Sequence, residues 1–227
     1  VKGEPVTIEA LDRILRARLP DKATSIPSTP PPVPGTAALM SANSCGSGQP
    51  VEIQTLAESL KCDVDLIYEY VYNNIEYEPL FGSNKGALGT LLDRRGNDID
   101  QVQLLLALLN AAGYSPSSIN VRYGYIRLNG STASGWLGVV NDGQAIANVF
   151  ANGGIPRDNF TLNKDGTLAT LDVGHVWVEV TINGTAYVFD PSFKQHTVHT
   201  GLSGIGGALG YTQSAFLTAA GGTIDSV

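Results

Sequence analysis

The strongest hydrophobic pattern in the chain lies between Asp98 and Ala112. A helix that is apolar on nearly every side belongs in the interior of a domain. Gly113 follows directly, and glycine is the residue that most often ends a helix. The pattern therefore predicts one central, buried helix, whose apolar residues recur at the helical period: Ile99, Val102, Leu104, Leu105, Leu106, Leu108 and Leu109.

Shorter helices are predicted on both sides of this central one. Apolar positions at helical spacing predict an amphipathic helix over residues 5–19, which Pro20 ends. Between this helix and the central one, residues 76–79 are predicted to be extended, and residues 82–92 are predicted to form a glycine-containing loop. The remaining helices are predicted over residues 51–60, 64–74, 144–150 and 211–220.

After the central helix the hydrophobic period changes from helical to alternating. Strands are predicted over residues 119–128, 136–140, 175–182 and 185–190, and turns at Asn129-Gly130 and Asn183-Gly184. Residues 141–170 are polar and of low periodicity outside the short helix. Helices followed by strands indicate an α+β fold, in which an antiparallel sheet packs on the central helix.

The N-terminal part of the chain differs in composition from the rest. Residues 22–49 are rich in Pro, Ser, Gly and Thr, which is typical of an extended linker. We therefore divide the chain into residues 1–49, an N-terminal helix with a Pro/Ser-rich arm, and residues 50–227, one domain. The arm is expected to lie across a groove of that domain or behind its sheet. Residues 201–210 are rich in glycine but lack the context of a phosphate-binding loop, and read as a linker.

Charge, hydropathy and cysteine content limit the possible partners, membrane spans and disulfides. The formal net charge of −7 and the pI of about 4.8 argue against nucleic acid or an anionic membrane surface as a partner. No apolar run approaches the roughly 20 residues of a membrane span. Cys45 and Cys62 form one disulfide if the protein is exported; otherwise Cys62 is a buried apolar residue and Cys45 a free thiol.

The second predicted hairpin brings a histidine and a carboxylate together. An Asn183-Gly184 turn fixes the strand register, so that Ile182 lies opposite Thr185. His175 and Asp190 then become diagonal neighbours on one face of the sheet, within side-chain reach. A carboxylate beside an imidazole fixes its tautomer and stabilises its charged form.

A structural reading of these residues stands beside the functional one. A lone histidine near a strand start is more often structural than catalytic. His196 and His199 lie in a polar stretch without a Cys or Asp cluster at metal-ligand spacing, so we read them as surface residues and predict no metal and no cofactor.

Three motifs resemble the transglutaminase-like superfamily. Arg95-Gly96-Asn97-Asp98-Ile99-Asp100, followed by the leucine-rich residues 104–113, resembles the start of its central helix. Residues 174–180 (GHVWVEV) resemble its histidine strand, and residues 187–191 (YVFDP) its aspartate strand. The resemblance spans about residues 60–195. Residues 65–71 and 82–92 further resemble a bacterial branch, often attached to large exported multidomain proteins, in which the cysteine is frequently absent.

The resemblance implies a papain/transglutaminase-like fold and a departure in its chemistry. Asp98 stands at the position of the nucleophilic cysteine, His175 at that of the base, and Asp190 at that of the orienting carboxylate. Asp100 matches the acidic residue of the family. A carboxylate attacking an amide must form a mixed anhydride, so transamidation and cysteine-type proteolysis are not expected. Asn97 and Asp98 are also preferred residues at a helix start, a purely structural reading.

Three hypotheses follow for the function. In the first, the domain has lost acyl transfer and binds a peptide or polysaccharide strand in its residual groove, contacted by Trp177, Glu179, Asn97 and Tyr125, with Tyr123 beside them. In the second, it is a carboxylate-based hydrolase, such as a glycoside hydrolase, that uses Asp98 with His175 or Glu179. In the third, Asp98 is an engineered substitution, and the natural protein is a cysteine enzyme. The resemblance further implies a secreted or periplasmic protein with additional domains.

Overall fold

The computed structural model describes residues 4–6, 45, 48–195, 204, 206 and 209–222. The chain divides into two compact units, Val1–His196 and Thr197–Val227. The second unit contains helix α9 (Gln213–Ala219). All other helices and strands named below belong to the first unit.

Four of the six α-helices described in the first unit begin at short polar side chains, and α2 and α4 do not. Asp63, Asn97, Asn129 and Asp142 each accept a hydrogen bond from a backbone N–H in the first turn of the helix that follows. Such side chains satisfy donors that have no partner within the helix, which fixes where each helix starts. The helices are α2 (Val51–Ser59), α3 (Val64–Asn74), α4 (Gly86–Asp93), α5 (Asp98–Ala111), α6 (Gly130–Leu137) and α7 (Gly143–Asn152), with a 3-10 turn at Pro116–Ser118.

A five-stranded antiparallel sheet forms the other layer. Its strand order is β1 (Glu4–Val6), β4 (Ile119–Leu128), β6 (Leu168–Ile182) and β5 (Arg157–Leu162), and β7 (Thr185–Phe189) also pairs with β6. The long strand β6 therefore pairs with three other strands. Separately, β2 (Glu76–Tyr77) and β3 (Arg95–Gly96) form a short parallel pair that precedes α5.

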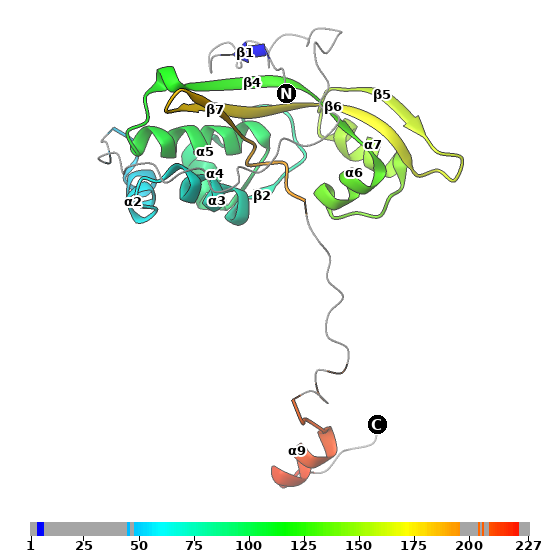
Figure 1. Ribbon diagram of the computed structural model, residues 1–227. Helices are drawn as coiled ribbons and strands as arrows, with labels where there is room; N and C mark the ends of the chain where they lie inside the picture. Colours follow the sequence, from blue (N-terminus) through cyan, green and yellow to red (C-terminus); the bar gives the residue numbers. More distant parts are fainter. Residues whose placement is uncertain are drawn as a thin grey trace. The chain divides into compact units, whose positions relative to one another are not determined.

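The core lies between this sheet and α5. Figure 1 shows α5 running beneath β4 and β7, with α2, α3 and α4 gathered around it. Its leucines pack against the inward face of β6, which carries Val176, Val178 and Val180. A second apolar cluster lies at the α6 and α7 end of the sheet: Ile126, Leu128, Trp136, Ile146, Phe150, Leu171, Val173 and Phe193.

Most predicted elements are confirmed. The central helix, the helices at 51–60, 64–74, 144–150 and 211–220, and the strands at 119–128, 175–182 and 185–190 form with shifts of a few residues at most, except that β6 begins seven residues earlier. The hairpin register is confirmed, because Ile182 pairs with Thr185 and Val178 with Phe189. Asn183 and Gly184 both have positive φ, as a type I′ turn requires. The α+β class is confirmed as well.

Three predictions around the sheet were wrong. Residues 136–140 are not a strand, because Trp136 lies in α6. Asn129-Gly130 is not a hairpin turn, because the side chain of Asn129 accepts the N–H of Thr132 and starts α6. The loop at 82–92 contains α4 instead. The start of α4 is fixed by the distant Asp100, whose Oδ1 accepts the N–H groups of residues 84–86, a signal absent from the local sequence.

The N-terminal predictions fall mostly outside the described residues. Pro5 and Val6 lie in β1, so the predicted helix over 5–19 is wrong at its start, and residues 7–19 are outside the described part. The Pro/Ser-rich arm at 22–49 also lies outside it, except for Cys45, Gly48 and Gln49. Most of the linker at 201–210 is likewise outside the described residues.

Cys45 and Cys62 form a disulfide, with their Cα atoms 5.9 Å apart. Cys62 is buried in the core just before α3, whereas Cys45 is exposed. Among the described residues, no helix has the length and apolar character needed to cross a membrane.

We expect Cys45→Ser to lower the free energy of unfolding by about 3 kcal/mol. The substitution opens a loop of 17 residues and leaves the buried Cys62 in place, so the lost stability is mainly that of the cross-link. Urea unfolding monitored by circular dichroism measures it. The wild type in reductant should unfold at the same urea concentration as the variant. Equal stability of variant and oxidised wild type would contradict a stabilising bridge.

Candidate functional site

The site forms where the first turn of α5 meets the middle of β6. Asp98 is the first residue of α5, His175 lies in β6, and Asp190 follows the last residue of β7. The Asn183-Gly184 hairpin brings the second and third of these together, and the packing of α5 on β6 brings the first. The three side chains therefore come from two separate parts of the fold.

The imidazole of His175 is bound to Asp190. Its Nε2 lies 2.7 Å from Oδ2 of Asp190. The other carboxylate oxygen accepts the N–H groups of Ser192 and Phe193 and the hydroxyl of Ser192. The backbone carbonyl of Asp190 accepts the hydroxyl of Tyr68 at 3.1 Å. These contacts fix the carboxylate in place and leave it no freedom to rotate.

Asp98 contacts the imidazole from the opposite side. Its Oδ2 lies 3.5 Å from Nδ1 of His175 and accepts the backbone N–H of Val176 at 3.0 Å. The pairing of β6 with β7 ends at Val178 and Phe189. Val176 precedes Val178 by two residues and has no partner in β7, so Asp98 supplies the acceptor for its N–H. Its Oδ1 accepts the N–H of Ile99 in the first turn of α5. Both oxygens are therefore engaged.

The electrostatics favour a charged imidazole. Burial lowers the pKa of His175, but the charges and hydrogen bonds of Asp190 and then Asp98 outweigh it and raise the pKa to about 10. A buried cation is tolerated only where partners compensate for its lost hydration. Here an imidazolium lies between two carboxylates, so the cluster carries one net negative charge near the N-terminus of α5, where anions are stabilised.

Aromatic rings close this cluster off from solvent. His175 has no exposed surface, and Asp190 and Asp98 are only 4% and 6% exposed. The ring of Trp136 meets the imidazole edge to face at 5.4 Å, with Phe193 and Trp177 at 6.2 and 6.3 Å. The indole N–H of Trp136 donates to the carbonyl of Ser192, which holds this cover in place.

None of the four residues predicted to contact a substrate lines the pocket described below. Trp177 is 1% exposed, whereas the prediction placed it at a groove. Asn97 is buried at the start of α5, where it accepts the N–H of Asp100. Glu179 forms an ion pair with Arg122 at 2.8 Å. Tyr125 is partly buried against the ring of Tyr123.

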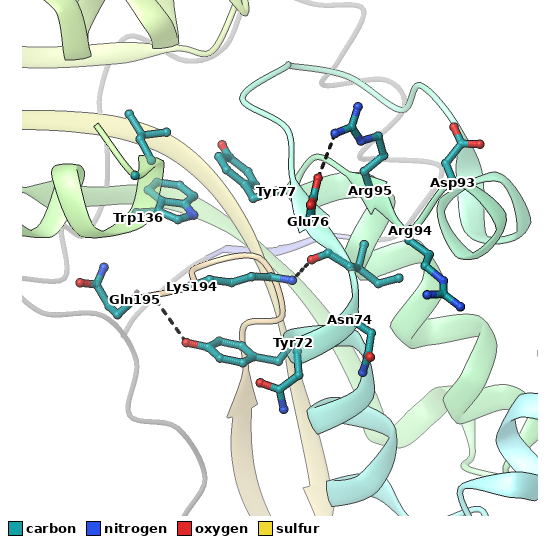
Figure 2. A pocket seen from close by; sticks show the side chains of 14 residues that line it. Tyr72, Asn74, Glu76, Tyr77, Asp93, Arg94, Arg95, Trp136, Lys194 and Gln195 are labelled. Carbon is teal, nitrogen blue, oxygen red and sulfur yellow. Dashed lines mark hydrogen bonds and ion pairs between the residues drawn. The ribbon is translucent and has the colours of Figure 1, made fainter. Parts of the chain in front are cut away.

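The structure has a pocket that the sequence did not indicate. It has a volume of about 1190 Å³, and Trp136 borders both this pocket and the imidazole of His175. Figure 2 shows the side chains from separate segments that converge on it. The sequence did not predict this pocket, because the strand predicted at 136–140 placed Trp136 in the sheet. The lining residues are Tyr72, Asn73, Asn74, Ile75, Glu76, Tyr77, Asp93, Arg94, Arg95, Trp136, Leu137, Gly138, Lys194 and Gln195.

A comparison with protein families matches this architecture. The family model of the transglutaminase-like superfamily matches residues 48–191, which is more than half of the chain and includes α5, β6, β7 and all three site residues. The chain belongs to the transglutaminase-like superfamily. The resemblance inferred from the motifs is thereby confirmed, and so is the fold that it implied. A search of curated proteins found no match.

This transglutaminase-like domain has no evident metal centre in the part of the chain that the structure describes. No group of three or more His, Cys, Asp and Glu side chains is arranged there to hold a metal ion. His196 and His199 lie outside the described residues.

We expect His175→Gln to lower the free energy of unfolding by about 3–5 kcal/mol. The substitution removes the cation and leaves two carboxylates buried without their partner. Urea unfolding at pH 7 measures the loss. The double variant Asp98→Asn/His175→Gln removes one of the stranded charges and should recover part of the stability. A His175→Gln protein as stable as the wild type would contradict the assigned ion pairs.

The contribution of His175 to the stability of the wild type should fall between pH 6.5 and pH 10. Below the ordinary pKa of 6.5 the imidazole is charged in both states and the ion pairs contribute in full. Above it, unfolding releases a proton from His175 that the folded state retains, so this contribution falls as the pH rises through the folded pKa of about 10. Lys194, whose pKa burial lowers to about 7, contributes a slope of the opposite sign, but it does so in the wild type and in His175→Gln alike. The difference in unfolding free energy between the two proteins should therefore shrink across this range, which unfolding curves of both measure. NMR signals of a neutral His175 ring at pH 8 would refute it.

Proposed function

We propose that this domain binds a peptide or glycan strand without carrying out acyl transfer. Asp98 would occupy the position of the family's nucleophilic cysteine, with His175 and Asp190 in the positions of its base and orienting carboxylate. The observation that carries the proposal is the complete burial of His175 between two carboxylates. The three residues then form a buried ion-paired cluster that stabilises the core.

Three properties of this cluster argue against chemistry. A general base must be unprotonated to take a proton, whereas the raised pKa of His175 keeps its ring charged at neutral pH. A nucleophile must come within about 3–3.5 Å of the substrate, and Asp98 is 6% exposed with both oxygens engaged. A carboxylate also lacks the nucleophilicity of the thiolate that it replaces.

The geometry gives less support to a carboxylate-based hydrolase. A glycoside hydrolase places two carboxyl groups on either side of the scissile bond. In this domain Asp98 and Asp190 both contact the same buried imidazole, which occupies the space between them. Glu179, the other acid considered, is paired with Arg122. The three carboxylates considered for this alternative are therefore each bound within the protein.

The pocket beside Trp136 supports the binding half of the proposal. Its volume of about 1190 Å³ suits several residues of a polymer, and exposed side chains from separate segments line it. It would replace the residual groove first assigned to Trp177, Glu179, Asn97 and Tyr125.

We also propose that the domain is part of an exported bacterial protein with further domains, secreted or in the periplasm. The Cys45–Cys62 disulfide supports this, because disulfides persist mainly in oxidising compartments. Mass spectrometry of protein isolated from its native host under alkylating conditions would test it. Recovery of two alkylated, reduced cysteines would speak against export.

We expect Asp98→Cys to gain no acyl-transfer activity and its thiol to resist iodoacetamide. The cover of Trp136 and Phe193 keeps both amine and alkylating agent away from a residue with 6% exposure. Incorporation of a fluorescent amine into a glutamine peptide and mass spectrometry of alkylation measure the two outcomes. Ser117→Cys, on an exposed turn, is the control that should be alkylated rapidly.

Two results would overturn the proposed function. The first is turnover of any peptide or glycan by the wild type that His175→Gln abolishes without unfolding the protein. The second is an absence of binding when peptide and glycan arrays are probed with the wild type. A fast-reacting Asp98→Cys thiol with amine incorporation would show instead that only the missing sulfur prevents catalysis.

A further inference from the structure

The residues that line the pocket beside Trp136 limit the chemical class of ligand that it can bind. This inference rests on the proposed function, since it names the class of strand that the pocket binds. The lining comes from the end of α3 and β2 (residues 72–77), from residues 93–95, from the end of α6 (136–138) and from Lys194 and Gln195. All four segments belong to the first unit of the chain.

The aromatic rings in this lining are already used by the protein. Trp136 is 3% exposed and contacts Tyr77, Phe150 and Phe193. Tyr77 is stacked on Trp136 with the ring centroids 4.5 Å apart. A sugar ring is usually held against an open aromatic face, which these two rings do not offer. The third ring of the lining, Tyr72, is partly buried and has the ammonium of Lys194 5.8 Å from its centroid. Exposed amides of Asn73, Asn74 and Gln195 remain. Asn74 and Gln195 each donate one N–H to a backbone carbonyl, of Tyr70 and Thr132, which leaves a second N–H and the amide oxygen for a peptide group.

The charges of the lining leave two cations without a carboxylate partner. Arg95 pairs with Glu76 at 2.9 Å, and Asp93 with Lys85 at 3.3 Å. Within the described part of the chain, neither Arg94 nor Lys194 has a carboxylate within ion-pair distance. The charge that the pocket presents to a ligand is therefore positive, although the chain as a whole carries −7.

Lys194 is fixed at the inner side of the pocket. Its residue is 6% exposed, and its ammonium donates to the carbonyls of Val71 and Ile75 at the end of α3. Figure 2 shows this side chain reaching between Tyr72 and Trp136 to the carbonyl of Ile75. An ammonium has three donors, so two bonds to carbonyls leave one. Lys194 is as buried as Asp98 but, unlike Asp98, it lines the pocket, so we assign this third donor to a ligand there.

We propose that this pocket binds an acidic peptide segment, with a carboxylate on the ammonium of Lys194 and a second one reached by Arg94. Arg94 suits this role because it is exposed at the pocket margin on a backbone with positive φ, where the turn after α4 projects it. The amides of Asn73, Asn74 and Gln195 contact the peptide backbone between the two acidic side chains.

The environment of Lys194 adds a pH signature. Burial lowers its pKa to about 7, against the opposing effects of Asp190 and Glu76, and the other titratable groups around it are Tyr72 and Tyr77. A ligand carboxylate favours the charged ammonium, so binding should be tightest below pH 7. Affinity should then fall as the pH rises, because the ammonium loses its proton while the glutamate side chains of a ligand stay ionised throughout.

The test uses the full chain and fluorescein-labelled hexaglutamate, with fluorescence anisotropy as the measurement. Hexaglutamine and hexalysine are the matched neutral and basic probes, and oligogalacturonate is an acidic glycan. We expect hexaglutamate to bind best, and Arg94→Gln to raise its Kd about threefold. Lys61→Gln is the matched control, since Lys61 is also exposed on a backbone with positive φ but does not line the pocket. It should leave the Kd unchanged.

A second variant tests the inner cation. Lys194→Met should raise the Kd tenfold or more and remove the weakening between pH 6 and pH 8.5, provided that its circular dichroism matches the wild type. If it does not fold, Arg94→Gln and the pH profile of the wild type decide. Equal binding of hexaglutamine, or an unchanged Kd in Arg94→Gln, overturns this inference but not the proposed function. Preference for oligogalacturonate replaces the peptide with a glycan. Loss of all binding to every polymer defeats the proposed function itself.

Discussion

The fold of this domain depends on one buried cation. The imidazolium of His175 lies in the middle of β6 and contacts both the first residue of α5 and the segment after β7. Burying three charges costs far more hydration energy than one ion pair returns. The cost is offset here because each carboxylate also accepts backbone N–H groups, from Ile99 and Val176 on one side and from Ser192 and Phe193 on the other. In this network Nδ1 of His175, 3.5 Å from Oδ2 of Asp98, is the one side-chain atom without a hydrogen-bond partner, and the remaining bonds hold the central helix on the sheet in a single orientation.

We propose that Asp98 occupies the position of the superfamily's thiolate, and the physics that activates a thiolate there also stabilises an aspartate. The N-terminus of a helix and a neighbouring imidazolium both favour a negative charge, whatever atom carries it. A thiolate held there keeps a reactive lone pair. A carboxylate held there spends its oxygens on the N–H groups of Ile99 and Val176 and gains stability instead. Under the proposed function, the same electrostatic arrangement supports catalysis with a thiolate and structural integrity with the carboxylate.

The parts of the structure that the sequence predicted are those with a local cause. Asn183-Gly184 fixed the register that brings His175 to Asp190, and the leucines after Asp98 fixed the buried helix. What could not be predicted depends on distant partners. The start of α4 is held by Asp100, 14 to 16 residues away, and β5 is exposed on both faces and so lacks an alternating pattern. Asn129-Gly130 was misread because an asparagine before glycine can start a helix as well as a hairpin turn. Because of that error Trp136 was assigned to a strand of the sheet, and the pocket that it lines was not predicted. The lining of this pocket comes from residues 72 to 195, far apart in the sequence.

The buried cluster and the pocket are connected through one short segment. Asp190 binds the imidazole, and four residues later Lys194 lines the pocket and binds the last carbonyls of α3. Between them, Ser192 binds both the carboxylate of Asp190 and the indole of Trp136. Any loosening of the imidazolium would thus displace the cation and the aromatic wall that a ligand meets. The cluster of Asp98, His175 and Asp190 therefore stabilises the walls of the neighbouring pocket as well as the packing of α5 on the sheet.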